Sequence, residues 1–138
     1  MELSRNEQHY YVMTIIYNLL TDYTFSAMEV KRDASEIIES VLEMPLKDVP
    51  SYIIDTVNFV ASNYGAIKTK VSPLLKNWTW ERLPLLTQSI ILMSYTHFYE
   101  VDRADKKVVI NVAVNLAKKY IDEKQGKFIN ALLDKLLK

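Results

Sequence analysis

The sequence has no cysteine, only two glycines and four prolines, and no long run of apolar residues. Without cysteine the chain can form neither a disulfide framework nor a thiolate metal site, and this absence is typical of a cytoplasmic protein. Two isolated glycines exclude a glycine-rich phosphate-binding loop. Because no stretch approaches the roughly 18 apolar residues of a membrane span and the start lacks the pattern of a secretory signal, we expect no membrane association.

What is present is the composition of one folded helical domain. The chain has 138 residues, of which 49% are hydrophobic and 25% are charged, enough for a single core. The net charge is zero, but residues 1–60 hold four basic and ten acidic side chains, whereas residues 101–138 hold nine basic and five acidic ones. A basic C-terminal third indicates an anionic partner, or else attraction between the two oppositely charged parts of the chain.

Apolar residues recur at helical spacing along the chain and no segment alternates as a strand would, so we predict an all-α fold of about seven helices. Ser26 and Glu29 have the spacing of a capping box, which predicts that the second helix begins there. Asp48 is the expected cap of the third helix, which Gly65 closes. The other predicted helices span roughly residues 6–20, 67–75, 84–99, 106–120 and 125–137.

The helices at 84–99 and 106–120 have distinct apolar patterns. The segment PLLTQSIILMSYTHFY is apolar almost all round, which predicts a central helix enclosed by its neighbours. The helix at 106–120 is expected to turn one stripe inward: Val109, Val112, Ala113, Leu116 and Tyr120.

The sequence gives little support for catalysis. It has two histidines, His9 and His97, and neither has a second histidine at metal-ligand spacing. His97 falls in the apolar central helix and is interpreted as a hydrogen-bonded histidine of the core or its boundary. We therefore expect no catalytic residues, no metal and no cofactor.

Lysines cluster in the last two predicted helices and in the loop between them, and two aromatic residues lie among these lysines. Cations that bind phosphates and rings that stack on bases are typical of single-stranded nucleic-acid sites. The same lysines would also suit helix C-termini and solubility, so this second explanation stays open. The set comprises Lys118, Lys119, Tyr120, Lys124, Lys127, Phe128, Lys135 and Lys138.

Four motifs follow one another in the second half of the chain. They are Trp78 with Arg82-Leu83, then Ile90-Ile91-Leu92, then INVAVNLAKKY at 110–120, and then KFINALLD at 127–134. In this order and spacing they resemble the NusB family of transcription antitermination factors. Members of that family typically read W-x-x-x-R-L, an ILR-type helix, INEAVELAKKY and KFVNGVLD.

The resemblance implies a helical bundle of two packed subdomains, here residues 1–77 and 78–138, without enzymatic activity. It also implies an RNA-binding antitermination factor that binds boxA-like RNA together with the NusE-type ribosomal protein of the small subunit, in the transcription elongation complex. A homodimer is a further expectation. The RNA-binding residues it implies are Arg5, His9, Tyr17, Lys124, Lys127 and Phe128. Asn111 and Asn130 are interpreted as positioning the last two helices or as lying beside the RNA.

The chain departs from the family pattern at several charged positions. Val112 and Thr87 stand where acidic residues are typical, His97 lies in the segment that replaces YEL, and RNEQH replaces an arginine-rich start. Fewer phosphate contacts would lower salt-dependent affinity for RNA. An alternative function is therefore a divergent helical module for protein–protein interaction, with weak or no RNA binding.

Overall fold

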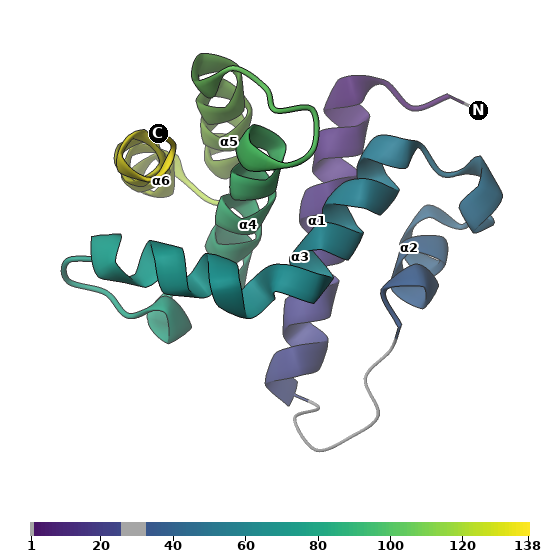
Figure 1. The fold of residues 1–138 in the computed structure, drawn as a ribbon, viewed down its shortest axis with the longest axis horizontal. Coiled ribbons are helices and arrows are strands. Elements are labelled where there is room, and N and C mark those ends of the chain that lie inside the picture. The colour runs from purple at the N-terminus through teal and green to yellow at the C-terminus, as the bar shows by residue number, and fades with distance from the viewer. Residues whose placement is uncertain (1, 26–32) are drawn as a thin grey trace.

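The computed structural model describes residues 2–25 and 33–138, and every regular element among them is helical (Figure 1). The all-α prediction is confirmed, with six α-helices in this part of the chain rather than about seven. They are α1 (Arg5–Phe25), α2 (Ala34–Leu42), α3 (Ser51–Val71), α4 (Leu85–Tyr99), α5 (Lys106–Tyr120) and α6 (Glu123–Leu136). Three short 3-10 turns complete the set: η1 (Leu46–Asp48), η2 (Ser72–Leu74) and η3 (Trp80–Arg82).

Helix α3 spans the position where the sequence predicted a break. Gly65 lies inside this helix, so the prediction that it closes one helix and that another runs over 67–75 was wrong. A glycine in a helix costs only about 1 kcal/mol, and the buried side chains of Ile67 and Val71 favour continuation. The backbone instead kinks at Asn63, where φ is −126° and ψ is 17°.

Two predicted helix starts have different outcomes. The capping box of Ser26 and Glu29 lies outside the described residues, and the described helix α2 begins after Asp33, whose carboxylate accepts a hydrogen bond from the Ser35 N–H. The predicted cap at Asp48 was wrong, because Asp48 lies in η1 and Pro50 occupies the N-cap position of α3. Proline suits this place because the first helical N–H groups have no intrahelical partner.

Helix α4 is the central helix, as predicted. It packs against α1, α3, α5 and α6, and ten of its side chains are buried. Several of its buried polar side chains have hydrogen-bond partners; Ser89 Oγ, for example, donates to the Met13 carbonyl oxygen of α1 at 2.6 Å. At its far end Tyr99 Oη donates to the Leu136 carbonyl oxygen and accepts from the Lys138 N–H, which joins α4 to the end of α6.

Helices α5 and α6 form a pair at one end of the molecule, and α2 lies toward the other end (Figure 1). Among the described residues, no helix combines the length and apolar character needed to cross a membrane. The division into subdomains at residues 77 and 78 stays a prediction.

Candidate nucleic-acid interface

The first turn of α6 is fixed by two hydrogen bonds. The Asp122 carboxylate accepts a hydrogen bond from the Gln125 N–H at 2.8 Å, which caps the helix. The side-chain oxygen of Gln125 in turn accepts from the hydroxyl of Thr87 at 2.8 Å, which joins α6 to α4. The first two turns of α6 carry three of the predicted RNA-binding residues: Lys124, Lys127 and Phe128.

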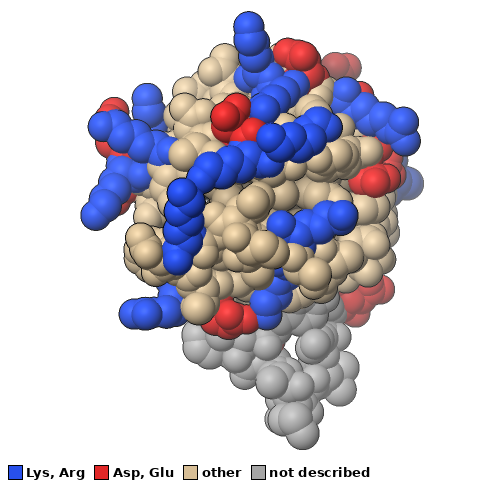
Figure 2. Space-filling model, turned by 60° about the vertical axis from the view of Figure 1, so that its left-hand side comes forward, with Lys and Arg blue, Asp and Glu red and all other residues tan. Residues whose placement is uncertain are grey.

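These three residues and Lys135, two turns after Phe128 along α6, form what we call the α6 surface. Its three lysines are exposed, and no acidic group of any described residue lies within 4.0 Å of them. Phe128 is half-buried against the core, so its ring is already held in place. Figure 2 shows basic side chains spread across this side of the molecule, with several acidic groups among them and toward its edges. The α6 surface can therefore bind an anion without first breaking an ion pair.

Arg5 and His9 lie in a different place, which we call the His9 cluster (Arg5, His9, Tyr52, His97 and Asp102). Arg5 Nη1 donates to Asp102 Oδ2 at 2.6 Å, and its guanidinium lies over the Tyr52 ring, 4.4 Å from the centroid. His9 is 5% exposed, and its Nδ1 lies 3.0 Å from Tyr52 Oη. His97 is also 5% exposed, as expected for a core histidine, and its ring centroid lies 5.3 Å from that of His9.

Both histidines are neutral at pH 7. Burial lowers the pKa of His9 to about 4, and the nearby His97 and Arg5 act in the same direction. Burial also lowers the pKa of His97, against the opposing effect of Asp102. The His9 cluster thus adds no free cation to the molecular surface, because its one permanent cation, Arg5, already has an acidic partner. No three acidic, histidine or cysteine side chains in the described ranges are grouped as metal ligands.

A hollow of about 420 Å³ lies between α1 and α5. Tyr120, predicted to face inward, is 38% exposed here, and its ring lies 5.2 Å from that of Tyr10. The inward prediction failed because Tyr120 is the last residue of α5, where the chain turns toward α6. The polar and aromatic lining consists of Asn6, His9, Tyr10, Asn111, Asn115, Lys119 and Tyr120.

The side chains of Asn111 and Asn130 are both exposed, and neither side chain forms a hydrogen bond with another described residue. In this part of the chain, neither asparagine side chain therefore positions a helix through a hydrogen bond. Tyr17 is 38% exposed and lies two turns after Tyr10 on the same face of α1. A role beside RNA stays a prediction for all three.

Comparison with known proteins identifies the family of this chain. A sequence profile described as the NusB family matches residues 8–138. The chain belongs to the NusB family. The transcription antitermination protein NusB of Macrococcus caseolyticus is 32% identical over 136 residues, which cover 99% of this chain and 98% of the relative. The protein of the same name from Pseudothermotoga lettingae is 34% identical over 125 residues, 86% of this chain and 89% of the relative.

Solved structures agree with the family in fold. The NusB of T. maritima matches with a TM-score of 0.82 at 22% identity, over 99% of this chain and 92% of that one. A chain in a crystal structure described as a plectonemic RNA supercoil matches with a TM-score of 0.76 at 20% identity, over 96% and 92% of the two chains. The NusB-like helical bundle expected from the motifs is confirmed.

Proposed function

We propose that this chain is an RNA-binding transcription antitermination factor, cytoplasmic and without enzymatic activity, which binds boxA-like single-stranded RNA through the α6 surface. The antitermination part is supported by the family, since the two relatives described above are named transcription antitermination proteins. The observation that carries RNA binding is the α6 surface, where three exposed lysines, none with an acidic partner in the described part of the chain, share one helix with a half-buried aromatic ring.

Each part of the α6 surface has a physical role in this proposal. Lysine ammonium groups neutralise phosphates and release counterions, which supplies affinity for any strand. An aromatic ring stacks on an unpaired base, and only single-stranded segments leave bases free to do so. Because Phe128 is held by its contacts with the core, stacking on it costs little side-chain freedom.

A NusE-type ribosomal protein of the small subunit is the proposed protein partner, within the transcription elongation complex. Thr87 and His97, which replace residues typical of the family, are buried and have contacts inside the molecule. The partner would therefore contact other side chains. A homodimer stays a prediction, which sedimentation of the purified protein would test.

A second function is favoured by the start of α1. There Arg5 is held by Asp102, and His9 is buried and neutral, so the two residues that the family resemblance assigns to RNA offer no free cation. This arrangement favours a protein–protein interaction module with weak or no RNA binding.

Reversing the charge of Lys124 and Lys127 together (Lys124→Glu and Lys127→Glu) should weaken binding of a boxA-type single-stranded RNA roughly 25-fold at 0.1 M monovalent salt. Two lost phosphate contacts should also reduce the slope of log K against log salt by about 1.4. The measurement is fluorescence anisotropy of a labelled boxA-type oligonucleotide at several salt concentrations, beside an unrelated RNA.

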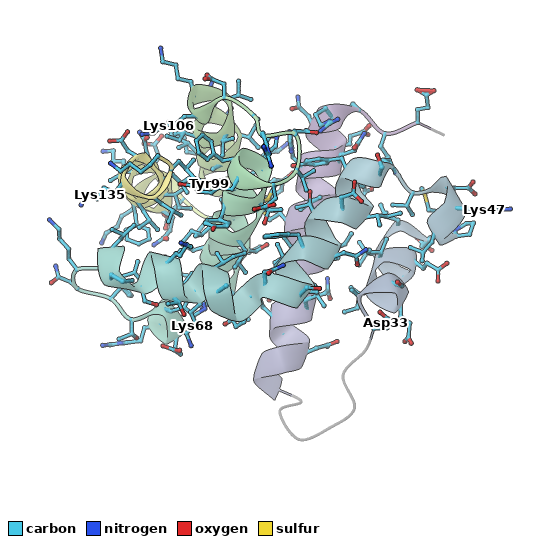
Figure 3. All side chains as sticks on the ribbon, in the orientation of Figure 1. Asp33, Lys47, Lys68, Tyr99, Lys106 and Lys135 are labelled. Atoms are coloured by element: carbon cyan, nitrogen blue, oxygen red, sulfur yellow. The ribbon has the colours of Figure 1, made fainter. Side chains whose placement is uncertain are left out.

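Lys47→Glu is the matched control, because Lys47 is an exposed lysine at the opposite end of the molecule from Lys135 (Figure 3). This control should bind as the wild type does. If the RNA affinity of the wild type does not depend on salt, or is no higher for the boxA-type RNA than for the unrelated RNA, the proposed function is wrong. The protein–protein interaction module is then favoured.

A further inference from the structure

The two tryptophans of the corner between η2 and α4 have opposite environments. Trp80 is 2% exposed, and its Nε1 donates to Tyr64 Oη at 2.8 Å. Trp78, two residues earlier, is 46% exposed. The corner itself is fixed, because Gln88 Nε2 donates to the carbonyl oxygens of Trp80 and Leu83 at 2.8 and 3.2 Å. Trp78 is therefore an exposed indole that directly precedes an anchored turn of the backbone.

Trp78 lies beside Phe128 of the α6 surface. The two residues together line two hollows, one of about 230 Å³ and one of about 90 Å³. The larger hollow continues along α6 to Lys135, and the smaller one ends at Lys124 and Gln125. An indole and a phenyl ring thus stand next to a groove between the corner and α6, on the side that carries the proposed RNA contacts.

The charge around these hollows is of one sign. Lys76, Lys124 and Lys135 contribute to their walls, and the lining residues include no aspartate or glutamate. Each of the three lysines is exposed and has no acidic partner among residues 2–25 and 33–138. Glu81, the nearest acid in the corner, is already paired with Lys68. A groove with aromatic walls and an uncompensated cationic rim is complementary to a single strand, whose bases are flat and whose backbone is anionic.

We propose that Trp78 is a base-stacking residue, which binds a base of the same single strand that contacts Phe128, while Lys76 and Lys135 bind the flanking phosphates. This proposal rests on the proposed function and extends the RNA path from α6 onto the corner before α4. Two rings beside one groove give the strand a second stacking site. Stacking of this kind tolerates any base, because every base has a flat aromatic face.

Affinity and fluorescence test the proposal together. Trp78→Ala should weaken binding of the labelled boxA-type RNA about 5- to 150-fold, whereas Trp78→Phe, which keeps a ring, should stay close to the wild type. Tryptophan emission should fall when unlabelled RNA is added to the wild type, because the base stacks on the exposed indole. In Trp78→Phe only the buried Trp80 remains, so the same addition should leave the emission unchanged.

The roles of Lys76 and Lys135 are tested by the salt dependence of RNA binding, with Lys47 as the control. Lys76→Ala and Lys135→Ala should each lower the salt slope by about 0.7, and Lys47→Ala should not change it. Suppose that the wild type binds the RNA with the expected salt dependence, but Trp78→Ala binds equally well and quenching persists in Trp78→Phe. The stacking site is then refuted while the proposed function stands. If the wild type does not bind the RNA, both proposals fail.

Discussion

Replacing Trp80 by alanine should lower the free energy of unfolding by about 3–5 kcal/mol, the largest loss that we expect from one side chain of this protein. The indole is buried in the core, and its ring centroid lies 6.2 Å from that of Tyr64 in an edge-on arrangement. Alanine would leave a cavity in place of the indole and would remove the hydrogen bond from Nε1 to Tyr64 Oη.

Urea unfolding followed by far-ultraviolet circular dichroism measures this loss without relying on tryptophan emission. Trp78→Ala is a matched control, because it removes the same side chain two positions away from a half-exposed site. It should cost less than about 1 kcal/mol. Equal losses in the two variants would contradict the assignment of one tryptophan to the core and the other to the surface.

This pair of variants also supports the interpretation of the RNA experiments. A Trp78→Ala protein that keeps its stability but loses RNA affinity has lost a contact with the strand. The two effects can be separated because Gln88 Nε2 bonds to the carbonyl oxygens of Trp80 and Leu83, which neither substitution removes.

The helices were predictable where the apolar pattern was strong. The bounds of α5 agree with the predicted 106–120, and the nearly all-apolar segment at 84–99 is the central helix. The prediction failed at Gly65, where local propensity indicated a break, because contacts made by Ile67 and Val71 with other parts of the chain outweigh the small cost of glycine. Such contacts cannot be found from the local pattern.

In the candidate site too, the sequence predicts contacts between near neighbours but not contacts between distant segments. Lys124, Lys127 and Phe128 are near neighbours in sequence, so one helical turn brings them together and the sequence predicts their proximity. Arg5 and Asp102 are 97 positions apart, and their ion pair follows only from the packing of α1 beside the end of α4. Likewise, sequence alone does not indicate which tryptophan of NWTWERL is buried. The lysine and asparagine just before Trp78 were the one available signal of exposure.

Lowering the pH from 7 to 5 should reduce the free energy of unfolding by about 2 kcal/mol through His9 alone. Burial lowers its pKa in the folded protein to about 4, whereas the unfolded chain has the ordinary value of 6.5. Between these two values the unfolded chain binds a proton that the folded protein does not, so stability rises with pH across this window. Below about pH 4 His9 is protonated in both states. The stability that neutral His9 contributes at pH 7 is then fully lost, and His9 causes no further change with pH.

The variant His9→Gln isolates this contribution, because glutamine keeps a polar side chain that can bond to Tyr52 Oη but does not titrate. Urea unfolding of both proteins at pH 5 and 7 gives the comparison. The stability difference between the two pH values should be about 2 kcal/mol smaller in the variant, while carboxylates and His97 contribute to both proteins. If both proteins lose the same stability between pH 7 and pH 5, folding does not lower the pKa of His9. His9 could then be protonated in the folded protein and offer RNA a cation at the start of α1.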